Sequence, residues 1–335
     1  MKRIVIYRLG SIGDTVVALP CFKIIRSSYP DHEILVLTNV PISHNAAPLL
    51  SVLGNDQQLV DGVIAYPVGT RSIKVLWKLA MQLRALKADT LIYLMADRSA
   101  MSAWRDWGFF KLAGFVQIIG FPYKKELRKN LIDEQTQTVE REAFRLLRCI
   151  EKVGQVDINE ASSWDLDLTL SEREAGHEFV KLFDNDKYFS VNMGGKEPIK
   201  DWGLTNWQAL FSSLKDKYGT YGLLAIGASS DFESAQKLLD GWSGKTVNAC
   251  GKLSPRVSAA ALEKSILFIG HDSGPFHLAS ALGVPAIGLY GDYNQPNLWH
   301  PYSHLSKVIH NMQGISAISV KEVESKIDCI LNTLI

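Results

Sequence analysis

Short apolar runs alternate with stretches of helical spacing along the first half of the chain. The runs Ile4-Val5-Ile6 and 34–37 lack polar alternation, which is typical of strands covered on both faces. Alternating strands and helices predict βαβ units around a parallel sheet. The predicted strands are residues 3–7, 33–38, 62–66, 90–95 and 116–120, and the predicted helices include residues 15–28 and 73–86.

The same alternation restarts after a polar segment, residues 152–167, which we interpret as a linker. Strands are predicted at residues 188–193, 222–227, 266–270 and 286–290, with helices between them. The final stretch, residues 319–334, is apolar at helical spacing, so it should pack against another part of the protein. Both halves are thus predicted to be doubly wound α/β units that direct the carboxyl ends of their strands toward one cleft. Ligands of such sheets bind in the loops after the strands.

Composition excludes several classes of protein. At 335 residues, two domains are expected. Lys plus Arg number 36 and Asp plus Glu 35, a net charge of +1 that excludes a globally basic nucleic-acid binder. No apolar run reaches the roughly 18 residues of a membrane span, and the start lacks the apolar core of a signal peptide. The 4 cysteines form no C-x-x-C pair, which suits a reduced, cytoplasmic setting.

The loop R-L-G-S-I-G-D-T, residues 8–15, follows a predicted strand and precedes a helix. Its two glycines allow a tight turn and a close approach to a ligand. The loop lacks the G-x-G-x-x-G pattern of dinucleotide-binding proteins. Asp14 has two interpretations: it satisfies helix amides in the first turn, or it is a carboxylate base exposed to substrate.

Two further loops are suited to phosphate. Residues 192–202 combine the Gly194-Gly195 pair with Lys196 and Lys200, although a solvated surface turn has the same composition. Residues 270–279 run from a strand into a helix, so free amides at Ser273 and Gly274 could hold a pyrophosphate with His277 one turn later. The alternative is a capped helix with a packed histidine. We expect no metal site, because His300 and His304 are separated by a proline and no H-E-x-x-H motif occurs.

A basic patch contrasts with the neutral total. It is either a solvated helix face or a docking surface for an anionic acceptor or an anionic membrane. Its members are Arg98, Arg105, Lys111, Lys124, Lys125, Arg128 and Lys129.

Three loops together resemble the bacterial heptosyltransferases, glycosyltransferase family 9. R-L-G-S-I-G-D-T followed by Leu19-Pro20 is similar to the amino-terminal signature of that family. D-S-G-P-F-H-L-A at residues 272–279 resembles its donor motif, and K-D-W at residues 200–202 resembles its lysine-tryptophan loop. The three motifs occur in family order over nearly the whole chain.

The resemblance implies a GT-B fold of two Rossmann-like domains. Residues 1–165 would bind the acceptor, residues 166–316 the donor, and the helix in residues 317–335 would pack back on the first domain. It implies inverting, metal-independent transfer without a cofactor from a nucleotide-diphosphate sugar, with ADP-heptose as the leading donor. The implied acceptor is a lipopolysaccharide core or related cell-surface glycan. We expect a cytoplasmic monomer in transient contact with the inner membrane and no nucleic-acid partner.

The resemblance also implies roles for individual residues. Asp14 would be the general base, and Asp272 would hold a hydroxyl of the donor sugar or ribose. Ser229 stands in a turn where some members carry an acid for nucleotide recognition, and Gly194-Gly195 replaces a hydroxyl-bearing pair of better-known members. A non-catalytic nucleotide-sugar-binding subunit, or a member using another nucleotide-diphosphate sugar, remains an alternative. The implied donor contacts are Gly194, Gly195, Lys196, Lys200, Ser273, Gly274 and His277, and the implied acceptor contacts are Ser11, Gly13, Arg98, Lys125 and Arg128.

Overall fold

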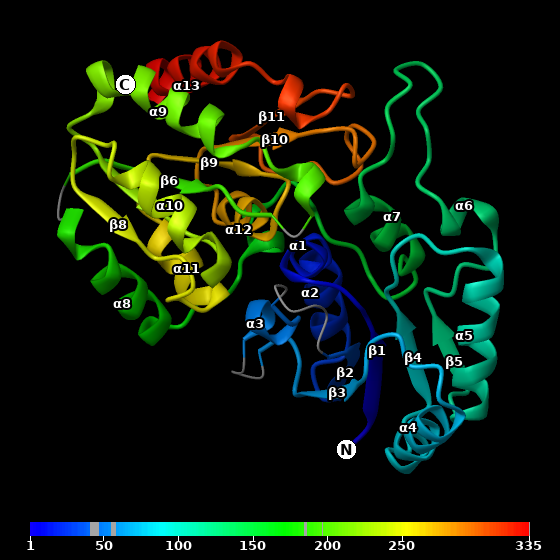
Figure 1. Ribbon diagram of the computed structural model, residues 1–335. Coiled ribbons are helices and arrows are strands. Elements are labelled where there is room, and N and C mark those ends of the chain that lie inside the picture. Colours follow the sequence, from blue (N-terminus) through cyan, green and yellow to red (C-terminus); the bar gives the residue numbers. More distant parts are fainter. Residues whose placement is uncertain (41–46, 55–57, 184–185, 196, 335) are drawn as a thin grey trace. The chain divides into compact units, whose positions relative to one another are not determined.

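The chain forms two compact units, residues 1–164 and 165–335. The computed structural model describes residues 1–40, 47–54, 58–183, 186–195 and 197–334 (Figure 1). Each unit is a parallel sheet with helices packed against it, as the alternating pattern predicts. The unit boundary lies one residue before the predicted domain boundary.

The sheet of the first unit has the strand order β3-β2-β1-β4-β5, and every pair is parallel. Tyr7, Leu37 and Tyr93 contribute to one apolar cluster with residues of the helices that follow. The strands are β1 (Arg3–Tyr7), β2 (Glu33–Asn39), β3 (Gly62–Tyr66), β4 (Thr90–Tyr93) and β5 (Gln117–Ile119). The helices are α1 (Ile12–Val17), α2 (Leu19–Ser28), α3 (Leu50–Leu53), α4 (Ile73–Ala85), α5 (Ala100–Leu112), α6 (Lys125–Arg128) and α7 (Glu142–Cys149).

One prediction for the first unit is wrong in detail. The single helix expected over residues 15–28 is two helices that meet at Ala18, because Pro20 occupies the first turn of α2 and suits a helix start better than an interior. The predicted linker, residues 152–167, contains the boundary between the two units, and part of it is ordered against the first unit. Its 3-10 turn η1 (Ala161–Trp164) packs against α2, and Ser163 donates a 2.6 Å hydrogen bond to the Asp157 carbonyl.

The sheet of the second unit is also parallel, with the order β11-β10-β9-β6-β7-β8. The outer strands β8 and β11 were not predicted, because their side chains are mostly half-buried and give no continuous apolar run. The strands are β6 (Tyr188–Asn192), β7 (Gly222–Ala225), β8 (Thr246–Asn248), β9 (Leu267–His271), β10 (Ala286–Tyr290) and β11 (Ser306–His310). The longer helices are α8 (Leu170–Phe179), α9 (Leu204–Tyr218), α10 (Phe232–Leu239), α11 (Pro255–Leu262), α12 (Gly274–Ala281) and α13 (Val320–Leu334).

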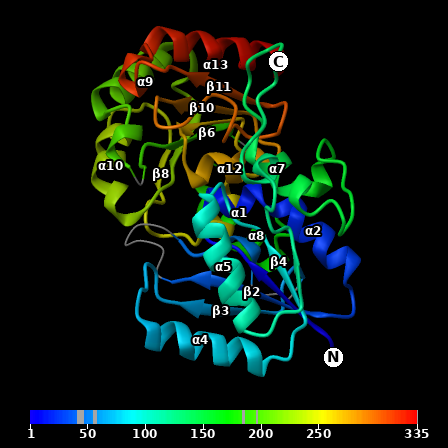
Figure 2. The same ribbon diagram turned by 90° about the vertical axis from the view of Figure 1, so that its right-hand side faces the viewer.

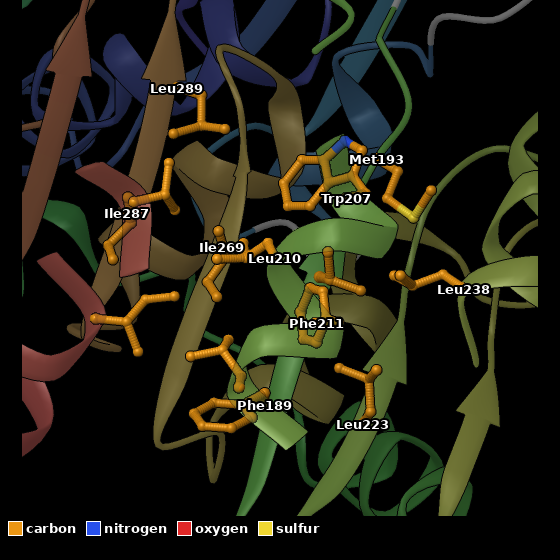
Figure 3. Packing of buried hydrophobic residues seen from close by; sticks show 14 of the residues in the cluster. Phe189, Met193, Trp207, Leu210, Phe211, Leu223, Leu238, Ile269, Ile287 and Leu289 are labelled. Atoms are coloured by element: carbon orange, nitrogen blue, oxygen red, sulfur yellow. The ribbon is translucent and has the colours of Figure 1, made fainter. Parts of the chain in front are cut away.

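Two apolar clusters cover the two faces of this sheet. One contains Phe268 and Phe276, and the other contains Phe189, Trp207 and the residues in Figure 3. The final helix, α13, packs on α9 and contributes its apolar side chains to the second cluster. This differs from the expected packing of that helix on the first domain, since its apolar face is buried within the second unit. These side chains are Val323, Ile327, Ile330 and Leu331.

In the part of the chain that the structure describes, no helix is long and apolar enough to cross a membrane.

Candidate functional site

Each sheet has a topological switch point, where neighbouring strands continue to opposite sides of the sheet. It lies between β1 and β4 in the first unit and between β9 and β6 in the second. Ligands of open α/β sheets bind at the carboxyl ends of the strands beside such a point. The three loops singled out from the sequence follow β1, β6 and β9, so all three lie at switch points.

Asp14 lies in the first turn of α1, which begins after the loop that leaves β1. Its Oδ2 accepts hydrogen bonds from the Ser11 backbone N–H at 2.8 Å and the Ser11 hydroxyl at 3.2 Å. Its other carboxylate oxygen receives no hydrogen bond from the described residues. Asp14 and Gly13 are both half-buried. The two interpretations of Asp14 are therefore compatible, because one oxygen positions the side chain while the other can take a proton.

Gly10 is required for this arrangement. Its φ is +134°, in a region that side chains disfavour, and a Cβ on Gly10 would overlap the Asp14 side chain. The shape of this turn therefore depends on the absence of a side chain at residue 10. The loop is built around the carboxylate.

Arg8 also belongs to this site, although the sequence did not predict a role for it. It is fully buried, and its guanidinium donates to the Leu94 carbonyl at 2.8 Å and to the Asp14 carbonyl. Burial lowers the pKa of Arg8 from its ordinary value of 12.5, while the Asp14 and Glu142 carboxylates act to raise it. The guanidinium ties the Asp14 turn to the end of β4, on the other side of the switch point. The sequence signal that could have identified Arg8 is an arginine directly after an apolar strand, at the start of the glycine loop.

Arg98 lies in the segment after β4, at the same edge of the sheet. Its guanidinium forms a 2.6 Å ion pair with Asp106, which also accepts a 3.0 Å hydrogen bond from the Tyr93 hydroxyl. Arg98 also lies 6.0 Å from the centre of the Tyr7 ring. The Arg98 side chain is 23% exposed, so it is held in place by Asp106 and still reaches solvent.

The other two predicted acceptor contacts lie on or beside the short helix α6. Lys125 is exposed at its start, whereas Arg128 donates to the carbonyls of Pro122 and Tyr123 at 3.3 and 3.2 Å. Among the described residues, neither side chain forms a hydrogen bond or an ion pair with Arg98. Some cations of the basic patch are therefore bound to other groups of the first unit, so the patch does not form one free surface.

The strongest cluster of the second unit centres on Asp272, directly after β9. Asp272 Oδ2 lies 2.6 Å from the Lys200 ammonium and accepts a 2.7 Å hydrogen bond from Asn294. The Lys200 ammonium also lies 4.5 Å from the centre of the Tyr293 ring. Three loops, after β6, β9 and β10, thus meet at one carboxylate. The sequence predicted Lys200 and Asp272 but not Asn294 or Tyr293, which follow β10 without a recognisable motif.

The amino-terminal turn of α12 is open to an anion. Ser273 is its N-cap residue, but the Ser273 hydroxyl donates to Asn192 at 2.8 Å instead of capping the helix. The backbone amides of the first turn, including that of Gly274, therefore carry no side-chain cap, and such amides bind phosphate. His277 lies one turn in and is 4% exposed. The helix predicted after this strand is present as α12, which begins at Gly274.

The glycine loop after β6 closes around Asp231. A Cβ on Gly194 would overlap the Asp231 carboxylate, whereas a Cβ on Gly195 would make only ordinary contacts. Asp231 Oδ2 accepts a 2.8 Å hydrogen bond from the Ala228 amide, and burial raises the pKa of this carboxyl above its ordinary value of 3.8. Ser229, the residue predicted in this turn, is exposed. Lys196 lies outside the described residues.

His271, the last residue of β9, holds the lysine-tryptophan loop through a hydrogen bond to its backbone. His271 Nε2 accepts a 3.1 Å hydrogen bond from the Trp202 backbone N–H, and burial lowers the pKa of His271 to about 4. The Trp202 indole in turn donates to the Ile318 carbonyl at 2.8 Å. A neutral histidine and a buried tryptophan therefore set the backbone that carries Lys200.

The described residues contain no group of three or more His, Cys, Asp or Glu side chains placed to hold a metal ion.

Known proteins similar to this chain include two lipopolysaccharide heptosyltransferases. Lipopolysaccharide core heptosyltransferase OpsX of Haemophilus influenzae is 22% identical over 313 residues, which are 92% of this chain and 84% of that protein. Lipopolysaccharide heptosyltransferase 3 of Escherichia coli is 25% identical over 304 residues, which are 87% of this chain and 83% of that protein.

Two solved structures have the same fold. A family 9 glycosyl transferase from Veillonella parvula superposes with a TM-score of 0.74 at 22% identity, covering 99% of this chain and 98% of that one. The E. coli heptosyltransferase WaaC with ADP gives a TM-score of 0.68 at 18% identity, covering 98% of this chain and 99% of that one. Residues 76–327, well over half of the chain, match the family described as glycosyltransferase family 9 (heptosyltransferase). The chain is a sugar-transferring enzyme of the GT-B fold and belongs to glycosyltransferase family 9.

Proposed function

We propose that this enzyme transfers heptose from ADP-heptose to a hydroxyl of a lipopolysaccharide core acceptor on the cytoplasmic side of the membrane. The observation that carries the proposal is the uncapped first turn of α12 beside the Lys200–Asp272 pair. A helix amino terminus next to a lysine suits a diphosphate, and the carboxylate suits a sugar hydroxyl. The relatives named above act on lipopolysaccharide, and one structural neighbour holds ADP, which favours this donor and acceptor.

The proposed reaction is a single displacement with inversion and without a metal ion. The acceptor oxygen attacks the anomeric carbon, its proton passes to the Asp14 carboxylate, and the bond from that carbon to the diphosphate breaks on the opposite face. ADP leaves with the bonding electron pair. Because the Asp14 oxygen that does not bind Ser11 receives no hydrogen bond within the described residues, it is the atom assigned to take the proton.

Stabilisation of the departing diphosphate falls to the second unit. Lys200 supplies a positive charge, the amides at Ser273 and Gly274 supply oriented dipoles, and His277 adds a side-chain donor. Such preorganised groups stabilise developing charge without a metal ion. The Lys200 ammonium lies 2.6 Å from Asp272 Oδ2 and 4.5 Å from the centre of the Tyr293 ring, and these two contacts hold it in position. When a donor binds, Asp272 and Asn294 would turn to the hydroxyls of its sugar or ribose.

Acceptor binding is proposed for the first unit. Ser11 and Gly13 flank Asp14, and Arg98 lies at the end of the neighbouring strand, where it would pair with an acceptor phosphate. Lys125 and Arg128 would extend this contact. The Asp106 carboxylate already neutralises part of the Arg98 charge, so Arg98 would orient the acceptor more than attract it from a distance.

Replacement of the base tests the proposal. Asp14→Asn keeps the size of the side chain and can still accept from Ser11, but it cannot take a proton at neutral pH. We expect kcat to fall by about 10²–10⁴, the usual contribution of a general base. ADP binding, measured by calorimetry, should stay within about twofold of the wild type. Transfer is measured as ADP release and as mass gain of a purified lipopolysaccharide acceptor, with and without EDTA.

Asp89→Asn is the matched control, because Asp89 is an exposed aspartate of the same unit whose side chain forms no hydrogen bond or ion pair with another described residue. It should turn over at the wild-type rate. Wild-type kcat in Asp14→Asn would contradict the base assignment, and a loss of transfer with EDTA would contradict the metal-free mechanism. Transfer from a different nucleotide sugar would replace the donor, and ADP binding without transfer to any acceptor would identify a non-catalytic subunit.

A further inference from the structure

The helix α4 exposes an apolar stripe that no part of the described chain covers. Ile73, Trp77 and Met81 are 84%, 65% and 47% exposed. Their spacing of four residues places them within about 80° of the helix circumference. The opposite side of α4 packs into the core of the first unit through Leu79 and Leu83, which are buried. The stripe therefore lies on the outer side of a helix that is already fixed by its inner side.

Cations accompany this stripe, and the nearest acidic residue after it in sequence is Asp89, beyond the end of α4. Residues 71–88 include five basic residues and no aspartate or glutamate, although the whole chain has a net charge of only +1. All five are exposed, and none forms an ion pair or a side-chain hydrogen bond with another described residue. They are Arg71, Lys74, Lys78, Arg84 and Lys87.

A second segment extends the same surface. The aliphatic part of Arg84 lies against Gly114, in the turn between α5 and β5, 3.5 Å from where a Cβ on that glycine would stand. Leu112 and Val116, on either side of Gly114, are 77% and 72% exposed. α4 lies at the periphery of the first unit with α5 beside it (Figure 2). We call the exposed sides of residues 71–87, with Leu112 and Val116, the α4 surface.

We infer that the α4 surface docks on an anionic lipid bilayer. An apolar stripe with a tryptophan, bordered by lysine and arginine, is the composition of a helix that lies in the membrane interface. The apolar side chains would enter the boundary between headgroups and acyl chains while the cations pair with lipid phosphates. A second copy of the chain fits less well, because a two-fold contact would bring five cations against five cations.

This surface differs from the basic patch expected for membrane contact. In residues 98–129, Arg98 is paired with Asp106, and Arg128 is bound to two backbone carbonyls. The α4 cations have no such internal use. The inference does not depend on the identity of the donor sugar, and it locates the membrane contact at α4 instead of α6.

Vesicle flotation tests the inference directly. The probes are vesicles of phosphatidylethanolamine with 30% phosphatidylglycerol, and vesicles of phosphatidylcholine alone. The full-length enzyme should float with the anionic vesicles at low salt and lose binding with added salt. Lys74→Glu with Lys78→Glu should lower the partition coefficient about tenfold or more, because charge near an anionic surface is reversed twice. Trp77→Ser should weaken binding without removing its salt dependence.

The control is Lys215→Glu with Lys237→Glu, which makes the same charge change at exposed lysines of the second unit. This variant should bind vesicles like the wild type. Equal binding of the α4 variant and the control, no binding by the wild type, or a wild-type dimer that the α4 variant converts to a monomer would each overturn the inference. Transfer to a delipidated, water-soluble acceptor fragment should be unchanged in the α4 variant. This assay needs no membrane, so it tests the proposed function independently of the proposed membrane docking.

Discussion

The position of the Asp14 carboxylate is set by atoms that sequence patterns do not show. The residue types Gly10, Ser11 and Asp14 predict a tight turn and a helix start, and both are present. That Gly10 is needed because Asp14 fills the space of its side chain is visible only in the structure. The role of Arg8 is likewise visible only in the structure, where its guanidinium donates hydrogen bonds to the Asp14 and Leu94 carbonyls.

Gly10→Ala tests this packing. The added Cβ overlaps Asp14 and is held at a φ of +134°, so we expect a loss of unfolding free energy of about 1–3 kcal/mol and a displaced carboxylate. kcat should fall with Asp14 out of place, while the affinity for ADP is unchanged. Thermal unfolding, turnover and calorimetric ADP binding measure the three quantities.

Gly69→Ala is the control for backbone strain alone. Gly69 has a φ of +65°, and nothing lies within 4 Å of an added Cβ. It should lose stability but keep kcat. If Gly10→Ala kept kcat as well, the close packing of residue 10 on Asp14 would have no part in catalysis.

At the scale of elements, strands that contain an apolar run were predictable, including the edge strands β3 and β5 of the first sheet. β1 and β10 match their predicted bounds because their apolar runs are continuous and buried. β8 and β11, the edge strands of the second sheet, were missed because their side chains are mostly half-buried and polar residues interrupt the apolar pattern. Among the loop residues, Lys200 and Asp272 were predicted because they belong to motifs. Asn294 belongs to no recognisable motif, and it reaches Asp272 because β10 lies beside β9.

The final helix shows why an amphipathic pattern does not name its partner. The spacing of Val323, Ile327 and Leu331 correctly predicted a helix with one buried face. It could not distinguish the first unit from the second, because any apolar surface satisfies the same stripe. In the structure α9 supplies that surface.

Lys200→Met tests the donor site, where three loops meet. The substitution keeps the length of the side chain and removes the charge proposed for the diphosphate. It also leaves the Asp272 carboxylate, whose side chain is 8% exposed, with Asn294 and Tyr290 as partners. We expect the Kd for ADP to rise at least about tenfold, the loss typical of a charge-assisted hydrogen bond. Titration calorimetry at two salt concentrations measures the change.

Lys215→Met, on the exposed side of α9, provides the comparison, because it removes one lysine of the same unit away from the switch point. Its Kd for ADP should equal that of the wild type. An unchanged Kd in Lys200→Met would show that the lysine-tryptophan loop does not hold the diphosphate.

At the scale of the whole molecule, the two units have separate apolar cores and separate proposed tasks. Within the described part of the chain, one apolar cluster of the first unit and two of the second have no buried residue in common. Charge is also unevenly placed, since a chain of net charge +1 carries five cations without an acid over residues 71–88. The net charge of the whole chain therefore gives no indication of this local cationic helix.

Separate cores predict that ADP stabilises the two units unequally. Because the proposed donor contacts all lie in residues 165–335, ADP at about 100 times its Kd should add about 2.7 kcal/mol to the unfolding of that unit. This corresponds to about 5–10 °C in its midpoint. Calorimetry with amide exchange should locate the added protection in β6, β9 and α12 and leave β1 and β2 unchanged. Asp14→Asn should keep the shift, whereas Lys200→Met should lose most of it. Equal protection of β1 and β2 by ADP alone would show instead that the first unit takes part in donor binding.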